Sequence, residues 1–455
     1  MKNIYAIGAL AVLFASCKPN ANVTTPATSG NANFTNYLAV GCSFTAGFGD
    51  NSLTVSGQLN SYPQRLFEQF ETIKDGKGAV GPFIQPLVKG DNGYPEAKLV
   101  LSTLAYCDGK VSMAPVKTTL PLDSNGSWKF TSLINNNQVN NVSVPKLRVA
   151  DIQVQGYAGP NPYARRFFYE PTKRPLDEIY ARVYNVHPTF FTLWLGATDL
   201  LGYAVAGGQG DGTGNAVPVT LNIYNSADIT PDQVFIDGYD SVLTALTSTG
   251  AFGALMNIPD ISALPYFTTI PMNGLHIDRQ GYADTLKTIY ATLNDKVFQL
   301  GDNYYIIRDH LNQVRQAVPG ELLLLTVPRD SITCAGWGST KPIPREYVLT
   351  TDELQNIRNA RDRFNARILQ HSRDRNLPYV DMDQFFKDLS TGIVYNGIDY
   401  TTQFVSGGAF SLDGIHLNGR GNALVANKVI ETINAFYKSN IPKTDVNKYP
   451  GVKFP

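Results

Sequence analysis

The sequence predicts an α/β protein with a central, mostly parallel five-stranded sheet and helices on both faces. Short apolar runs alternate with longer amphipathic runs along the chain, and this alternation is typical of strands joined by helices. Strands joined in this way run parallel, because the helix brings the chain back to the end of the sheet at which the preceding strand began. The expected strands span residues 37–40, 189–195, 253–258, 304–307 and 379–381.

Two helices in the C-terminal half carry the clearest helical patterns. Thr350 and Glu353 have the spacing of a capping box, in which the threonine begins a helix. Apolar residues then recur at three- and four-residue steps, at Leu354, Ile357, Ala360, Phe364 and Ile368. The last helix has the same period at Val425, Val429, Ile433 and Phe436. Pro442 and Pro450 predict that the tail, residues 441–455, is irregular.

Two stretches interrupt the alternation. Residues from about 79 to 146 are rich in Gly, Pro, Asn and β-branched residues and have no helical period, so we expect a β-rich insertion there. Residues 204–230 contain Gly-Gly-Gln-Gly-Asp-Gly at 207–212, which predicts a mobile loop. Such loops are often only tolerated surface insertions. Both stretches follow segments that contain candidate catalytic residues, described below, and we therefore expect them to shape a substrate pocket.

Residues 1–17 have the pattern of an export signal. The chain begins with a short positive segment, residues 4–15 are apolar, and a small residue precedes Cys17. This pattern resembles a bacterial lipoprotein signal, in which the cysteine becomes the lipid-modified first residue of the mature chain. An ordinary secretory signal cleaved near Cys17 is the alternative, and the apolar run is too short to span a bilayer in either case. Residues 18–34 are poor in large apolar groups and predict a flexible tether.

Composition narrows the class of partner for the main domain, residues 35–440. The chain has 455 residues, with 38 Lys plus Arg and 38 Asp plus Glu and no run of like charge. We therefore expect neither nucleic-acid binding nor a polybasic membrane patch. No Cys-x-x-Cys, His-Glu-x-x-His or Gly-x-x-x-x-Gly-Lys pattern occurs, so no metal and no nucleotide cofactor is expected. The expected partner is a small or neutral molecule.

If Cys17 is lipidated, three cysteines remain. An oxidising compartment then allows at most one disulfide within the chain. We take Cys107 with Cys334 as a working pair and Cys42 as a small buried residue, although the sequence leaves the other pairings open.

Three residues from opposite ends of the chain supply the parts of a serine-nucleophile site. Ser43 stands at the carboxyl end of an expected strand, and Asp413 stands three residues before His416, near the last expected helix. A hydroxyl is a poor nucleophile at neutral pH, so it needs a neutral imidazole within reach and an anion that fixes the imidazole tautomer. On its own, an Asp-x-x-His pair belongs more often to a turn before a helix. Ser43 alone could equally be a helix cap or turn residue.

Four segments, in order along the chain, resemble the sequence blocks of the SGNH or GDSL hydrolases. The first is Gly-Cys-Ser-Phe at 41–44, where the family has Gly-Asp-Ser-Leu. The second is residues 151–156, which end on Gly156 at the family's oxyanion glycine, with Gly159 as the alternative. The last is Ser-Leu-Asp-Gly-Ile-His-Leu-Asn at 411–418.

The third segment departs from the family pattern. Residues 193–199 read Leu-Trp-Leu-Gly-Ala-Thr-Asp, and Thr198 stands where the family has asparagine. The resemblance implies that the oxyanion is bound by the N–H groups of Ser43 and Gly156 and by the side chain at position 198. A threonine hydroxyl has a shorter reach than an asparagine amide, so we expect slower hydrolysis than the family pattern alone implies.

The resemblance covers about residues 36–438 and fits a lipoprotein branch found in Bacteroidota. It implies an SGNH-hydrolase-like, flavodoxin-like three-layer sandwich in which Ser43 is the nucleophile, His416 the base and Asp413 its partner. The expected protein is an exported serine esterase, anchored to the outer membrane by lipid on Cys17, that acts on a small-molecule, glycan or lipid ester without a cofactor. The alternative is an exported binding or scaffolding lipoprotein with weak or no catalysis.

Overall fold

A computed structural model describes residues 26–124, 138–166, 168, 170, 172–220, 223–293 and 296–455. Its centre is a five-stranded sheet in the order β13–β6–β5–β1–β4, and every neighbouring pair is parallel. The strands are β1 (Tyr37–Gly41), β4 (Asn141–Ser143), β5 (Phe190–Trp194), β6 (Phe252–Met256) and β13 (Tyr379–Val380). The predicted parallel α/β architecture is confirmed.

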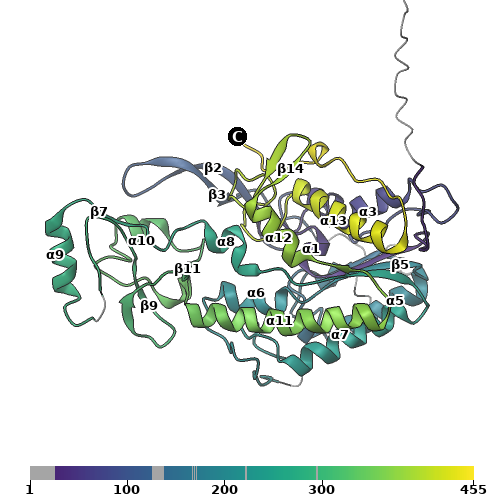
Figure 1. The fold of residues 1–455 in the computed structure, drawn as a ribbon, viewed down its shortest axis with the longest axis horizontal. Coiled ribbons are helices and arrows are strands. Elements are labelled where there is room, and N and C mark those ends of the chain that lie inside the picture. The colour runs from purple at the N-terminus through teal and green to yellow at the C-terminus, as the bar shows by residue number, and fades with distance from the viewer. Residues whose placement is uncertain are drawn as a thin grey trace, which may run out of the picture.

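Helices cover both faces of this sheet. Figure 1 shows α3 (Tyr62–Phe70), α12 (Met382–Thr391) and α13 (Gly419–Tyr437) on one side of the sheet. The helices on the other side are α5 (Pro175–Val186), α6 (Thr198–Val205), α7 (Asp232–Thr247) and α11 (Thr351–Asp374). Because both faces are covered, β1 and β5 are buried along their whole length, as their continuous apolar sequences require.

The two long helices that the sequence predicted begin where their caps place them. At the start of α11, the Thr350 side chain accepts a hydrogen bond from the Glu353 N–H, and the Glu353 carboxylate accepts one from the Thr350 N–H, which completes the predicted capping box. At the start of α13, the Asn418 side chain accepts from the N–H groups of Arg420 and Gly421. This cap ends the preceding turn, which contains Asp413 and His416.

One of the five predicted strands lies outside the central sheet. Residues 304–307 overlap β9 (Ile306–Arg308), which pairs in antiparallel fashion with β10 (Val314–Gln316). Both belong to a smaller lobe, residues 270–348, which has its own buried apolar cluster. A short apolar run predicts a buried strand, but any sheet can bury it. The run itself therefore does not specify which strand pairs with it.

The fifth strand of the central sheet is β4, which we had placed in the insertion. Only three residues long, it is nevertheless buried throughout, and it lies at the sheet edge beside β1. The β-rich character expected for the insertion is present before it, in the antiparallel hairpin of β2 (Leu99–Ala105) and β3 (Val111–Lys117). Residues 125–137 lie outside the described residues.

The remaining elements are short. The lobe also contains β7 (Leu275–Ile277), α9 (Gln280–Ile289), β8 (Gly301–Asn303), β11 (Leu322–Leu323), α10 (Arg329–Thr333) and η5 (Arg345–Tyr347), and β12 (Val348–Leu349) pairs with β11. The main body contains the α-helices α1 (Ser43–Ala46), α2 (Val55–Leu59) and α8 (Pro265–Thr268) and the strands β14 (Ile393–Tyr395) and β15 (Ile398–Tyr400). Its 3₁₀ helices, written η, are η2 (Val149–Asp151), η3 (Ala164–Arg166), η4 (Ile261–Ala263) and η6 (Val446–Lys448). Apart from η6, residues 441–455 are irregular, as Pro442 and Pro450 predicted.

A disulfide joins the hairpin to the lobe. Cys107, in the turn between β2 and β3, is bonded to Cys334, directly after α10, and Cys42 is a free, buried thiol. The working pairing is therefore confirmed. Figure 1 shows the hairpin reaching from the main body toward the lobe. The predicted signal, with Cys17, and most of the predicted tether lie outside the described residues, and no helix among the described residues is long and apolar enough to cross a membrane.

Candidate active site

Ser43 lies at the carboxyl end of β1, where the strand turns sharply into α1. The turn is close-packed: a Cβ atom on Gly41 would lie 2.0 Å from Thr45 Oγ1 and 2.8 Å from the backbone oxygen of Trp194. Only glycine fits between the first helix and the neighbouring strand β5. Ser43 is the first residue of α1 and is 5% exposed, so its hydroxyl faces a largely enclosed site.

The structure brings the two ends of the chain together at this serine. Ser43 Oγ lies 2.8 Å from His416 Nε2, and His416 Nδ1 lies 2.9 Å from Asp413 Oδ2. All three side chains lie within hydrogen-bonding distance in the order hydroxyl, imidazole, carboxylate. The imidazole can therefore accept the serine proton while the carboxylate fixes its tautomer.

The Asp413 carboxylate is held by several donors besides the imidazole. Its Oδ1 atom accepts from the N–H groups of Ile415 and His416 at 2.9 and 2.8 Å and from Ser411 Oγ at 3.0 Å. Burial alone would raise the pKa of Asp413, but the charge of His416 and these hydrogen bonds hold it well below its usual range. The carboxylate is thus ionised and fixed in orientation beside the imidazole.

Aromatic rings enclose the imidazole. The ring centroids of Phe44 and Phe48 lie 5.2 and 4.7 Å from that of His416. Phe48 also contacts Tyr163 edge-on at 5.8 Å. These rings leave the imidazole little freedom to turn and keep water from most of its surface, which strengthens its hydrogen bonds.

Gly156, the predicted oxyanion donor, is already engaged elsewhere. Its N–H donates to the backbone oxygen of Thr172 at 3.0 Å, so this N–H is not free to bind an oxyanion. Gly159, the alternative, donates its N–H to the Gly156 oxygen at 2.9 Å. Both glycines belong to a loop whose own backbone hydrogen bonds use these donors.

The segment after β4 comes beside Ser43 instead. Ser143 pairs with Gly41, and the Val144 N–H donates to the Gly41 oxygen at 3.2 Å, so β4 continues past the end of β1 next to the serine. Three residues beyond Ser143 stands Lys146, whose φ of 66° turns the backbone sharply. Among the described residues, neither the Ser43 N–H nor the Lys146 N–H has a hydrogen-bond partner. The sequence signal for this segment is Val-Ser-Val at 142–144 before Pro145, which we had assigned to the insertion.

Thr198 lies on the other side of Ser43, at the start of α6. Its hydroxyl is hydrogen-bonded to the thiol of Cys42, the residue before Ser43; burial raises the pKa of that thiol, and the Thr198 hydroxyl opposes the rise. In lowering this pKa the Thr198 hydroxyl acts as a donor to the sulfur, and the same O–H is the group that would donate to an oxyanion.

The next residue, Asp199, fixes the segment after β4. Its carboxylate accepts from the N–H groups of Val149 and Ala150 at 2.9 and 3.2 Å and from Thr230 Oγ1 at 2.6 Å. Burial raises the pKa of Asp199 to about 6, although these hydrogen bonds act to lower it. Asp199 therefore ties the chain after Lys146 to the start of α6, and the backbone on both sides of Ser43 is held in one arrangement.

Comparisons with known proteins give little further information. No protein-family model and no curated protein matches this chain. One similar solved structure is an extracellular lipase from Streptomyces rimosus. It is 11% identical, with a TM-score of 0.33, and the similarity covers 88% of this chain and 99% of the lipase chain.

Among the described residues, no group of three or more His, Cys, Asp and Glu side chains is placed to hold a metal ion. The arrangement around Ser43 can be described with protein groups alone: a hydroxyl, an imidazole, a carboxylate and nearby donors.

A turn that the sequence analysis missed holds the Asp413 segment from the other side. Asp50 and Asn51 have φ values of 52° and 61°, and the Asn51 N–H donates to Asp413 Oδ2 at 3.1 Å. The Asp50 N–H donates to Ser411 Oγ at 3.0 Å, and Asp50 Oδ1 accepts from the Leu412 N–H at 2.8 Å. Gly-Asp-Asn-Ser at 49–52 is a strong turn signal, because Asp and Asn tolerate positive φ, but nothing in it indicates what the turn contacts.

Asp50 should make stability depend on pH. Burial and the nearby charge of Asp413 raise the pKa of Asp50 to about 6, although the Leu412 N–H and Lys98 act in the opposite direction. The folded protein therefore holds this proton to a higher pH than the unfolded chain does. Relative to Asp50→Asn, which keeps an oxygen for Leu412, the wild type should lose up to about 3 kcal/mol in its free energy of unfolding as the pH rises from about 4 to about 6.

Urea unfolding of the wild type and of Asp50→Asn across this pH range measures the effect. The difference between the two free energies should change up to about pH 6 and stay constant above it. A difference that does not depend on pH would contradict the raised pKa.

Proposed function

We propose that this protein is a serine esterase that hydrolyses carboxylic esters through Ser43, His416 and Asp413. The observation that carries the proposal is the continuous hydrogen-bonded line from Ser43 Oγ through His416 to Asp413, at 2.8 and 2.9 Å. This is the arrangement that activates a hydroxyl as a nucleophile. The family-level proposal, an SGNH-type hydrolase, rests on the four sequence blocks together with the parallel sheet on which three of them lie at strand ends or just before a helix.

The reaction proceeds in two halves. His416 Nε2 takes the proton of Ser43 Oγ as the oxygen attacks the ester carbonyl, and the Asp413 carboxylate stabilises the imidazolium. The imidazolium then protonates the departing alcohol, which leaves an acyl group on Ser43. A water molecule gives its proton to His416 and attacks this acyl group, and the acid departs with Ser43 reprotonated.

We assign the oxyanion donors to the two sides of Ser43. The N–H groups of Ser43 and Lys146 are unpaired among the described residues, and the Thr198 hydroxyl lies beside Cys42. This assignment replaces Gly156 with Lys146, because the Gly156 N–H is bonded to Thr172. Donors fixed in this way are worth more in an enclosed site than in water, since they need no reorientation as the charge develops.

Thr198→Val is expected to lower kcat about a hundredfold, or about 3 kcal/mol, with little change in KM. Valine has the shape of threonine without the hydroxyl, so it removes one donor that acts mainly in the transition state. Thr198→Ser keeps the hydroxyl and is the matched control. Steady-state kinetics with p-nitrophenyl acetate compare the two, and a valine variant as fast as the serine variant would remove Thr198 from the oxyanion site.

We also propose that the protein is exported and anchored to the outer membrane by lipid on Cys17. The support is the signal pattern of residues 1–17 and the disulfide between Cys107 and Cys334, because such bonds persist mainly in oxidising compartments. A Cys17→Ser variant should move from the membrane fraction to the soluble fraction of expressing cells. An unchanged distribution would contradict the anchor without bearing on catalysis.

Acyl transfer to an added alcohol tests the esterase mechanism. An acyl group on Ser43 can pass to water or to methanol, so hydrolysis of p-nitrophenyl acetate in dilute methanol should yield methyl acetate as well as acetate. The ratio of the two products should follow the methanol concentration and be the same for other acetyl esters. The absence of methyl acetate, or a ratio that changes with the leaving group, would contradict a shared acyl-enzyme.

A further inference from the structure

A cavity of about 350 Å³ lies beside the Asp413 segment but does not include Ser43 or His416 among its lining residues. Its walls come from the 47–60 segment, the start of β2, the start of α13 and the C-terminal residues 450–455. We propose that this cavity is a second ligand site, for a small organic anion with a carboxylate or phosphate head and a short apolar tail. The site does not depend on the esterase reaction.

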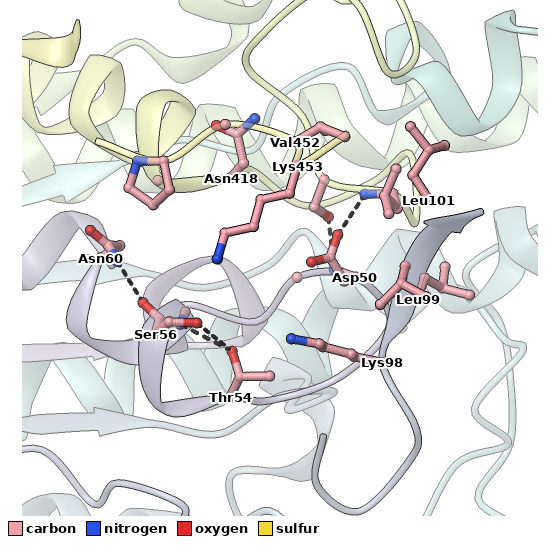
Figure 2. A pocket seen from close by; sticks show the side chains of 18 of the residues that line it. Asp50, Thr54, Ser56, Asn60, Lys98, Leu99, Leu101, Asn418, Val452 and Lys453 are labelled. Atoms are coloured by element: carbon pink, nitrogen blue, oxygen red, sulfur yellow. Dashed lines mark hydrogen bonds between the residues drawn. The ribbon is translucent and has the colours of Figure 1, made fainter. Parts of the chain in front are cut away.

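Two lysines carry the argument for an anion. Figure 2 shows the side chain of Lys453 extending from the C-terminal segment into the cavity, and the Nζ atom of Lys98 pointing into the same space from the opposite wall. Neither lysine forms an ion pair or a side-chain hydrogen bond with any described residue. Lys453 is exposed and Lys98 partly buried; two ammonium groups that face the same half-open cavity repel each other, and an anion between them offsets this repulsion.

Neutral donors lie next to the lysines. Ser56 and Asn60 line the cavity on the side toward which Lys453 extends, and Asn60 Nδ2 donates one hydrogen bond, to the Ser56 oxygen at 2.8 Å, which leaves its second N–H free. Head groups with several oxygens accept from donors of this kind as well as from lysine.

The opposite wall is apolar. Leu99 and Leu101 alternate along β2 and so face the same side, and Val452 joins them from the C-terminal segment. Burying a short alkyl chain against these side chains should raise the affinity about fourfold per methylene group. A ligand with both an anionic head and an alkyl tail therefore fits the cavity better than an inorganic ion does.

Acidic groups limit where the head can bind. The Asp50 carboxylate faces the cavity near Lys98, and Asp91 accepts from the Ser56 N–H at 2.8 Å. Asp91, on the side of Ser56 and Lys453, is exposed, so water weakens its repulsion, whereas Asp50 is partly buried beside Lys98; the head of the anion therefore belongs nearer Lys453, with Lys98 shared between the ligand and Asp50. Lys453 should thus contribute more to the affinity than Lys98.

Isothermal titration with sodium hexanoate and with hexyl phosphate at low ionic strength tests the site. We expect one ligand to bind per chain, with a Kd of about 1 mM or tighter for at least one of the two, and the tighter binder identifies the head group. Lys98→Met with Lys453→Met should weaken binding at least about tenfold. The matched control is Lys77→Met with Lys341→Met, which removes the same charge from exposed lysines that do not line the cavity and should bind as the wild type does.

Three results would overturn the proposal: no saturable binding of either anion, equal binding by the Lys98 and Lys453 double variant, or equal binding of the neutral alcohol hexanol. Thermal unfolding of the double variant should stay close to that of the wild type, because among the described residues neither lysine forms an ion pair or a side-chain hydrogen bond, and Lys98 has only a longer-range electrostatic interaction with Asp50. The titrations give the same answer in a Ser43→Ala background, so failure of this site and failure of the esterase proposal are separate results.

Discussion

Ser43→Ala is expected to lower kcat/KM for p-nitrophenyl acetate by about 10⁴-fold to 10⁶-fold. Alanine has no group that can attack the ester, and it loses the hydrogen bond between the Ser43 hydroxyl and His416. The remaining donors around the site can still bind the ester and polarise it, so a small residual rate is expected. Loss of the hydroxyl removes one contact and no packing, and the thermal unfolding midpoint should therefore change little.

A second buried serine provides the control for this experiment. Ser61 is fully buried and its hydroxyl has no hydrogen-bond partner in the part of the chain that the structure describes, so Ser61→Ala makes the same chemical change away from the imidazole. This variant should hydrolyse the ester at the wild-type rate. If Ser43→Ala also kept the wild-type rate, the nucleophile would have to be another group.

Asp413→Asn is expected to lower kcat by about 10⁴-fold with little change in KM. In the wild type, the carboxylate accepts the proton on His416 Nδ1, which leaves Nε2 free to accept the serine proton. An asparagine oxygen in this position would still accept from the N–H groups of Ile415 and His416, so its NH₂ group would face the imidazole and favour the wrong tautomer. The loss therefore arises in the chemical step and not in ester binding.

The chain contains a second aspartate–histidine pair that serves as the control. Asp240 is hydrogen-bonded to His371, which lies in α11, and it also pairs with Arg367. Asp240→Asn should lower the stability of the protein, because His371 is buried, but leave kcat unchanged. Equal losses of kcat in Asp240→Asn and Asp413→Asn would mean that the effect at Asp413 is a general loss of folded protein.

The sequence predicts the central sheet well where an apolar run is bounded by turn residues, even for the two-residue strand β13. Four of its five strands overlap the predicted ranges, because their apolar runs are bounded by turn residues. The strand β4 was missed because three residues in a β-rich stretch give no period to detect. Residues 304–307 are apolar because they pack in the smaller lobe, and which of two cores a strand joins depends on contacts far apart in the sequence.

The candidate site was predictable in its local parts. Asp413 and His416 stand three residues apart in one turn, and Ser43 stands two residues after the end of a buried strand, so each signal lies within a few residues. The turn at Asp50 and Asn51 was not predictable, because its contact with Asp413 joins residues 362 positions apart. The strand that pairs with β1 determines which backbone N–H lies beside Ser43. Because β4 was missed, the sequence predicted Gly156 and not Lys146 as the oxyanion donor.

Labelling with a fluorophosphonate tests the central claim most directly, because this reagent forms a covalent bond only with an activated serine. We predict that the folded protein takes up one phosphonyl group per chain, that peptide mass spectrometry places it on Ser43, and that His416→Ala and heat-denatured protein take up none. This result would also exclude the binding or scaffolding alternative. A folded protein whose Ser43 stays unmodified under conditions that label a known serine esterase completely would contradict the account.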